Sequence, residues 1–261
     1  MKNYLLFLLS LVLSSCNNSS KKTEESYEAS ARWVSLFNGK DLEGWQIKIA
    51  DQELGVNLYN TFTVEDGILK IDYSGYGSFD EQFGALYTER PYTNYRLKVE
   101  YRFVGETTPG APSWGNRDSG VQYHCQDPAS MPIDQHFPVC LEYNLHGGNG
   151  TDDRPVGQIC LSGTLVELNG TAVKGCNDAT TPITIHGDQW ATLEIDVQGD
   201  KIKQFINGTE IVAFENPRFD SEHVLGKTFI KEGNDALRSG FISLQSNSHP
   251  IEFRKIEIME Y

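Results

Sequence analysis

The sequence of 261 residues predicts an all-β fold, a two-sheet antiparallel jelly-roll sandwich, from three observations. Apolar and polar residues alternate along many short segments, which is typical of strands with one buried face. Asn-Gly and Asp-Gly pairs, which favour tight hairpin turns, lie between several of these segments. No long segment has the spacing of an amphipathic helix. Strands without intervening helices are expected to pair antiparallel and to pack as two layers.

The N-terminus has the features of a targeting segment. In residues 1–16 a basic start precedes an apolar run and small residues, a pattern typical of secretory signal peptides. The ending Leu-Ser-Ser-Cys resembles the lipobox of bacterial lipoproteins, so we expect a lipid on Cys16; an ordinary signal peptide with an incidental cysteine is the alternative. The polar residues 17–31 predict a flexible tether. We therefore expect a cell-envelope protein, on the outer membrane or the periplasmic face, that contacts the membrane through its lipid alone.

Residues 32–261 predict a single jelly-roll domain, whose strands can be placed in chain order. Residues 62–71 predict two strands around an Asp-Gly turn, and residues 95–103 predict one strand with alternating apolar and charged side chains. Similar alternation, with an Asn-Gly turn inside 203–212, predicts strands at 190–197, 202–206, 240–245 and 251–258. Segments rich in Gly, Pro, Asp and Asn predict long loops at 105–117, 126–138 and 147–155.

The formal net charge of −14 at pH 7 argues against nucleic acid as a partner, because an acidic surface repels phosphate backbones. A neutral sugar is indifferent to that charge. The sequence contains no nucleotide-binding glycine motif and no Gly-x-Ser-x-Gly elbow. We predict no metal and no cofactor, although four loop aspartates that match no calcium motif could bind calcium: Asp127, Asp134, Asp152 and Asp153.

Besides Cys16, the chain has four cysteines, an even number that suits disulfide pairing in an oxidising compartment. A bridge between Cys160 and Cys176 would close a short loop and stabilise the fold by about 3 kcal/mol. Pairing of Cys125 with Cys140 stays open. Structural zinc is the competing use of four cysteines, but the sequence has no C-x-x-C spacing among them.

Two strands carry polar residues of an unusual kind on one face. Alternate residues of 139–146 and of 118–124 bear amides, imidazoles and a carboxylate instead of the Lys, Glu and Thr of an ordinary solvated face. If the strands are neighbours, they form one patch: Gln122, His124, Glu142, Asn144 and His146. Such directional donors and acceptors suit sugar hydroxyls, so we expect this face to bind a ligand rather than only solvent.

Two further segments add candidate binding residues. Trp114 lies in a polar loop, where its ring can pack against the apolar face of a sugar; a local structural plug is its alternative role. Near the C-terminus, four polar residues bracket a tight turn between two strands: Gln245, His249, Glu252 and Arg254. The simplest explanation of Glu252 and Arg254 is that they form an ion pair with each other on one face of the strand.

Eight short motifs, in order along nearly the whole mature chain, resemble the 3-keto-disaccharide hydrolase domain family. They are Ser35–Trp45, Val64–Leu69, Arg117–Val121, Val139–Glu142, Trp190–Glu194, Ile206–Gly208, Gly240–Gln245 and His249–Ile256. The resemblance implies a concanavalin A-like jelly roll with a saccharide on its concave face, in a lipoprotein of the kind common in Bacteroidota. It implies cleavage of glycosides oxidised to a ketone at C3.

The resemblance also implies site residues on three segments: Asp118 and Ser119, then Glu142, then Gln245, His249, Glu252 and Arg254. This chain departs from commoner members of the family in three ways. It has Asn144 two residues after the carboxylate, it has Cys125, and it has a long loop before Cys140.

A ketone at C3 acidifies the C2 proton of a sugar and places the glycosidic oxygen β to the carbonyl. A general base can therefore remove that proton and expel the aglycone, and hydration completes a net hydrolysis. We expect Glu142, His124 or His146 to be the base. We expect Arg254 or Gln245 to stabilise the enolate.

Three other functions compete with this chemistry. In a two-carboxylate glycosidase, Glu142 would act with Glu252 or Asp118. A non-catalytic carbohydrate-binding lipoprotein would use the same polar patch. An adhesion module would need an exposed apolar patch, and the polar faces of the strands argue against one.

Overall fold

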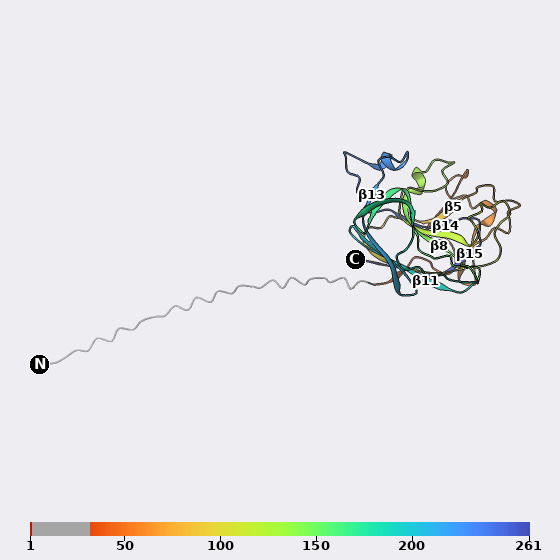
Figure 1. Cartoon of the computed structure of the whole chain (residues 1–261), viewed down its shortest axis with the longest axis horizontal. Coiled ribbons are helices and arrows are strands. Elements are labelled where there is room, and N and C mark those ends of the chain that lie inside the picture. The colour runs from red at the N-terminus through yellow and green to blue at the C-terminus, as the bar shows by residue number, and fades with distance from the viewer. Residues whose placement is uncertain (2–31) are drawn as a thin grey trace. The chain divides into compact units, whose positions relative to one another are not determined.

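The computed structural model describes Met1 and residues 32–261, so the predicted signal peptide apart from Met1, the lipidation of Cys16 and the whole predicted tether lie outside the described residues (Figure 1). Within the described residues, the regular structure consists of fifteen antiparallel strands and three short 3-10 turns. The turns are η1 (Leu58–Asn60), η2 (Pro128–Ser130) and η3 (Gly226–Phe229). Among these residues we find no helix with the length and apolar character needed to cross a membrane.

The strands have these bounds, in chain order: β1 (Val34–Ser35), β2 (Trp45–Ile49), β3 (Phe62–Glu65), β4 (Ile68–Ile71), β5 (Gly84–Thr88), β6 (Tyr95–Phe103), β7 (Asp118–Cys125), β8 (Cys140–His146), β9 (Ile159–Leu168), β10 (Thr171–Asn177), β11 (Ala191–Gln198), β12 (Lys201–Ile206), β13 (Thr209–Phe219), β14 (Phe241–Ser246) and β15 (Ile251–Glu260). The strands predicted from alternation are all present. The three predicted loops connect β6 to β7, β7 to β8 and β8 to β9.

Hydrogen bonds join the strands in the order β2-β5-β14-β7-β8-β9-β13-β12-β11-β6-β15-β4-β3, with β1 beside β15 and β10 beside β9. In Figure 1, β5, β14 and β8 lie close together. Side chains of β7 and β8 reach β12, which is several strands away along this path. The amide of Gln204 donates to the Tyr123 hydroxyl at 3.0 Å, and the Tyr143 hydroxyl donates to the Phe205 carbonyl at 3.2 Å. The strands therefore form two facing layers, as predicted for a jelly-roll sandwich.

The core lies between the two layers and follows from the alternation of the sequence. In β6 the five apolar side chains from Tyr95 to Phe103 are buried, while the charged residues between them stay partly exposed. In β8, Leu141, Tyr143 and Leu145 are buried in the same core. The intervening residues of β8 must then point to the other face of the sheet. Burial of each such large apolar side chain stabilises the fold by about 1.5–3 kcal/mol.

The predicted placement of His124 beside Gln122 on the outer face is wrong. The backbone of His124 has φ +50°, and the pairing of β7 with β14 shifts register at this point. This irregularity turns the ring into the core, where it lies edge-on to Tyr95 with ring centroids 6.1 Å apart. The side chain is 1% exposed, and burial together with the positive charge of Arg238 lowers its pKa to about 4. His124 is therefore not available as the predicted base.

Candidate functional site

A cavity of about 560 Å³ lies on the face of β14, β7, β8 and β9 that points away from the core. This volume is in the range of small-molecule sites. Each of the three predicted loops contributes to its lining, through Trp114, Phe137 and Arg154 respectively. The strands contribute polar side chains that form its floor: Asp118, Glu142, Asn144, His146 and Gln245.

The floor forms because β7 and β8 are neighbouring strands, and their register places residues of the same sheet face opposite one another. Gln122 pairs with Glu142, Gly120 with Asn144, and Asp118 with His146. The predicted patch is thus present without His124. Gln122 is buried behind the floor, and it supports Glu142 instead of lining the cavity.

Glu142 lies partly buried at the floor, and one of its two carboxyl oxygens is held by amides. Oε2 accepts a hydrogen bond from Gln122 at 2.9 Å and another from Gln245 at 3.2 Å. Gln122 in turn accepts from the Ser243 hydroxyl at 2.9 Å, which fixes its orientation. Burial raises the pKa of Glu142 to about 8; the amide of Gln122 opposes this rise, and the negative charge of Asp118 adds to it. A carboxyl group with such a pKa can exchange a proton near neutral pH.

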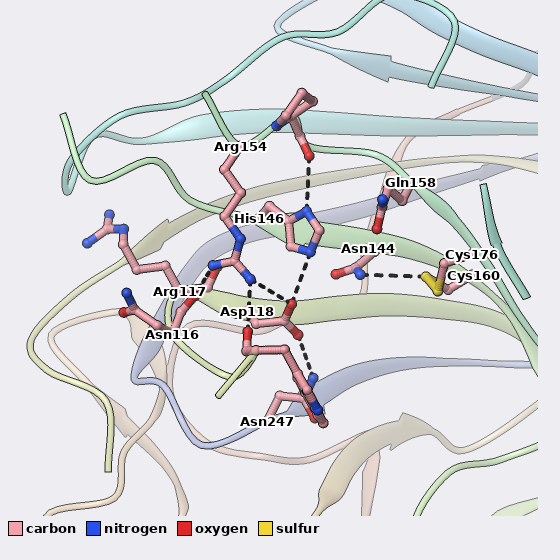
Figure 2. Close-up of polar contacts among 12 residues, drawn as sticks. Asn116, Arg117, Asp118, Asn144, His146, Arg154, Gln158, Cys160, Cys176 and Asn247 are labelled. Carbon is pink, nitrogen blue, oxygen red and sulfur yellow. Dashed lines mark hydrogen bonds and ion pairs between the residues drawn. A yellow bond between two sulfur atoms is a disulfide. The ribbon is translucent and has the colours of Figure 1, made fainter. Parts of the chain in front are cut away.

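Asp118 and His146 form a second ionisable pair in the cavity (Figure 2). His146 Nε2 lies 3.1 Å from Asp118 Oδ2, and His146 Nδ1 lies 3.1 Å from the Pro155 carbonyl oxygen. A carbonyl oxygen can only accept, so Nδ1 carries a proton. When Nε2 is also protonated, its contact with Asp118 Oδ2 is a charge-assisted hydrogen bond. This pair can therefore supply a proton to a bound molecule.

Arg154 connects this pair to the loop that carries Trp114. Its guanidinium lies 3.2 Å from Asp118 Oδ2 and donates to the Trp114 carbonyl at 2.9 Å and to the Arg117 carbonyl at 3.2 Å. It also donates to the Asn116 carbonyl. Burial lowers the pKa of Arg154, and the charge of Asp118 counters that effect. Asn247 completes the surroundings of Asp118 by donating to Oδ1 at 2.7 Å.

Three amide oxygens among the cavity residues have no hydrogen-bond partner within the part of the chain that the structure describes: Asn144 Oδ1, Gln245 Oε1 and Asn247 Oδ1. Buried polar atoms are normally paired, since leaving one unpaired costs about 1–3 kcal/mol. All three atoms are buried beneath the cavity surface rather than exposed to its interior. Asn144 and Gln245, which the sequence predicts as binding residues, line the cavity.

Two predicted residues near the turn after β14 do not line the cavity. The Ser119 hydroxyl is buried and donates to the Gln245 carbonyl at 2.8 Å, so it joins β7 to β14. His249 is buried beside Phe103, and its Nδ1 lies 2.8 Å from the Thr107 hydroxyl. Burial and the charge of Arg117 lower the pKa of His249 to about 4. Ser119 therefore joins two strands of the layer that carries the site, and His249 contacts the loop that carries Trp114.

Glu252 and Arg254 lie on β15, in the opposite layer, and their predicted place in the site is wrong. Glu252 pairs with Arg102 at 2.6 Å, and Arg254 pairs with Glu100 at 2.6 Å and lies over the Trp190 ring. The predicted ion pair between Glu252 and Arg254 is therefore also wrong. Each of the two side chains is paired instead with a residue of the neighbouring strand β6. Arg254 cannot stabilise an enolate in the cavity, and Glu252 cannot be the second carboxylate of a glycosidase there.

The predicted disulfide between Cys160 and Cys176 is confirmed, with an S–S distance of 2.05 Å. It joins β9 to β10 and lines the cavity, where the Asn144 amide lies 3.5 Å from Cys160 Sγ. Cys125 and Cys140 are buried free thiols in the described structure. Within residues 32–261 we find no group of three or more His, Cys, Asp or Glu side chains arranged to hold a metal ion.

Sequence reasoning missed Arg154, Asn247 and the cavity role of the disulfide. Arg154 follows two aspartates in a loop and is indistinguishable from a solvated charge in the sequence. Its contact with Asp118 spans 36 positions, and the contact of Asn247 with Asp118 spans 129. Only the pairing of β7 with β8 and with β14 brings these side chains together.

Comparison with known proteins gives a family match for nearly the whole domain. The profile of a family described as the 3-keto-alpha-glucoside-1,2-lyase-like domain matches residues 32–259. A search of curated proteins found no match.

Solved structures are similar at the level of the fold. Two proteins of Parabacteroides distasonis, described provisionally as glycosyl hydrolases, have TM-scores of 0.52 and 0.53 at 17% and 19% identity. The first match covers 91% of this chain and 97% of that one, and the second covers 88% and 100%. A Bacillus subtilis protein of unknown function with a galectin-like fold has a TM-score of 0.52 at 10% identity, covering 88% and 94% of the two chains. These similarities agree with the jelly-roll architecture of the described domain.

Proposed function

Because this chain belongs to the 3-keto-alpha-glucoside-1,2-lyase-like domain family, we propose that it cleaves glycosides oxidised to a ketone at C3. Membership of the family makes the protein carbohydrate-active in the broad sense. The reaction that we propose is removal of the C2 proton, elimination of the aglycone from C1 and addition of water to the resulting double bond. The observation that carries the proposal is Glu142, a carboxyl with a pKa of about 8 at the floor of a sugar-sized cavity.

Glu142 is the proposed base, and Oε1 is the atom that takes the proton. Both amides that hold the side chain bond to Oε2, which leaves Oε1 above Gly120 for the substrate. At pH 7 a group with a pKa of about 8 is ionised in about a tenth of the molecules. Its basicity is correspondingly higher than that of an ordinary glutamate, which favours abstraction of a proton next to a ketone.

Proton removal leaves the electron pair of the C2–H bond in an enolate at C3. The enolate collapses to a C1–C2 double bond as the C1–O bond breaks, and the aglycone oxygen takes the bond electrons. Asn144, between Glu142 and His146 on the same face of β8, can donate its amide hydrogen to the enolate oxygen. The proton held between His146 and Asp118 goes to the departing oxygen. Addition of water across the double bond then gives the 3-keto sugar.

The geometry favours this chemistry over a two-carboxylate glycosidase. Asp118 is the remaining cavity carboxylate beside Glu142 within the described lining. His146, Arg154 and Asn247 all contact its two oxygens. A carboxylate with so many partners is poorly suited to be a free nucleophile.

Incubation of the purified protein with native and 3-oxidised disaccharides tests the proposal. Release of the free sugar from the 3-keto disaccharide, with no release from the native one, is the expected result. A non-catalytic carbohydrate-binding protein is the second candidate, because the polar side chains of the cavity floor suit binding equally well. Binding of both sugars without any product would favour that candidate.

We further propose that the domain is carried on a lipid at Cys16, a residue outside the described part of the chain. The lipobox-like ending of the N-terminal segment supports this. Metabolic labelling with a clickable fatty acid should mark the wild-type protein and not Cys16→Ala. Equal labelling of the two proteins would contradict lipid attachment at this cysteine.

A further inference from the structure

The cavity has an apolar flank beside its polar floor. Trp114 is 46% exposed, and its ring stacks on Phe83 with centroids 5.8 Å apart and an interplanar angle of 13°. Phe137 packs on the same Phe83 at 4.9 Å, and both Trp114 and Phe137 line the cavity. One flank of the cavity is therefore a surface of aromatic rings.

This aromatic flank is held in place before any ligand binds. His136 packs against Phe83 at 5.3 Å and Phe79 packs against it at 4.9 Å, so four rings contact Phe83 when Trp114 and Phe137 are included. The guanidinium of Arg154 donates to the backbone carbonyl of Trp114 at 2.9 Å and so ties the loop to the floor. A ring that is immobile before binding loses little conformational entropy when a ligand packs on it.

The opposite flank is also poor in hydrogen-bonding groups. Phe83 precedes β5, whereas the Cys160–Cys176 disulfide joins β9 to β10, and β14, β7 and β8 lie between β5 and β9. The disulfide and Gly175 line the cavity from that side. Among the described lining residues of this side, Gln158 and Ser162 are polar, and the Gln158 amide nitrogen already donates to Asp178 at 2.7 Å.

We propose that this cavity takes aryl glycosides, with the sugar on the polar floor and a flat phenolic aglycone against Trp114 and Phe137. A second sugar in the aglycone position would direct several hydroxyls toward flanks with few partners, at a cost for each unpaired group. An aromatic ring needs no such partners and stacks favourably on Trp114. Phe137 belongs to the long loop between β7 and β8, so this part of the aromatic flank is carried by a loop and not by the sheet. The inference rests on the proposed function for the identity of the sugar, and on the aromatic flank for the aglycone.

Equilibrium binding of unoxidised glucosides tests the aglycone site without any turnover. We would titrate the wild-type protein with phenyl glucoside, methyl glucoside and a glucose disaccharide, using calorimetry. Phenyl glucoside should bind about three- to tenfold more tightly than methyl glucoside, as expected for one added aromatic stack. Trp114→Ala should abolish most of this preference, and Trp114→Phe should restore part of it. Tyr59→Ala, which removes an aromatic ring that is 61% exposed and does not line the cavity, should leave the preference unchanged.

Several results would overturn the aryl site. They are equal affinity for phenyl and methyl glucoside, a preference that survives in Trp114→Ala, tighter binding of the disaccharide, and no measurable binding of phenyl glucoside. Failure of the proposed reaction is a separate result. A protein that binds phenyl glucoside through Trp114 but cleaves no 3-keto glycoside would retain the aryl site and lose the elimination chemistry.

Discussion

Gly120 lies directly beneath the carboxyl group of Glu142, on the strand next to it. A Cβ atom at Gly120 would be 2.7 Å from Glu142 Cδ and 2.9 Å from Oε1, closer than real Cβ atoms approach such neighbours. The missing side chain therefore leaves the space in which the carboxyl group lies across β7 toward Gln122 and Gln245. The position of the proposed base depends on a glycine of the neighbouring strand.

Gly120→Ala should displace the Glu142 carboxyl without removing it. We expect kcat on a 3-keto glycoside to fall about 10- to 100-fold, because a misplaced catalytic group is costly. The free energy of unfolding should fall by about 1–3 kcal/mol from overpacking. Steady-state kinetics and denaturant unfolding measure the two effects. Wild-type kcat in the folded variant would show that the carboxyl position does not matter.

Glu142→Gln should lower kcat by about 10²- to 10⁴-fold, the usual contribution of a general base. The amide fills the same space, so the affinity for an unoxidised glucoside should change little. Comparison of kcat with the dissociation constant separates loss of chemistry from loss of binding. The matched control is Ser119→Ala, which removes a hydroxyl that lies close to the site but outside the cavity lining.

The pH dependence of activity should follow the pKa of Glu142. The base must be ionised, so kcat/KM should rise with pH and level off above about 8. Glu142→Gln should lack this limb in its residual activity. A wild-type profile that is flat between pH 6 and about 9, with chemistry rate-limiting, would contradict the assignment.

The same pKa predicts how stability changes with pH. Burial raises the pKa of Glu142 from 4.5 to about 8, so between these values the folded protein binds more protons at this group than the unfolded chain. The contribution of this group to stability is therefore largest at low pH and falls as the pH rises through this range. Glu142→Gln should gain stability relative to wild type, by about 3 kcal/mol, on going from pH 5 to pH 8. Chemical denaturation of both proteins at the two pH values measures the difference.

Asp118→Asn should remove the proton that the pair with His146 holds for the leaving group. We expect kcat to fall about 10- to 100-fold on a 3-keto disaccharide. The loss should be much smaller on a nitrophenyl 3-keto glucoside, because nitrophenolate leaves without protonation. Equal losses on the two substrates would indicate that Asp118 acts through the structure of the site alone.

Removal of the disulfide should affect both stability and binding. Cys160→Ala/Cys176→Ala should lose about 3 kcal/mol of stability in the chain-entropy model. It should also raise KM, because the bridge lines the cavity and Asn144 lies against Cys160 Sγ. Cys125→Ser, which leaves the bridge intact, is the control. An unchanged KM in the folded double variant would confine the bridge to a structural role.

The fold could be predicted because strand alternation is a local property. The alternation of β6 predicts which of its side chains are buried, and the Asp-Gly turn predicts the hairpin of β3 and β4. The same alternation within β8 correctly placed Glu142, Asn144 and His146 on one face.

The wrong predictions concern a residue where the backbone departs from regular alternation and a strand whose layer the sequence does not reveal. One positive φ at His124 moved a predicted base into the core. The alternation of β15 is clear in the sequence, but nothing in it shows that the strand belongs to the layer away from the cavity. Arg154 and Asn247 gather around Asp118 through strand pairing over long distances in the chain, which no local pattern reports.

The fate of the hydrogen at C2 of the sugar tests the central claim most directly. A 3-keto disaccharide would be cleaved in D₂O and the released 3-keto sugar examined by NMR, with 3-keto sugar alone as the control for spontaneous exchange. Abstraction by Glu142 predicts deuterium at C2 in the product of the wild-type protein, above that control, and no such product from Glu142→Gln. Release of sugar that keeps its original hydrogen at C2, or wild-type turnover by Glu142→Gln, would contradict the elimination mechanism.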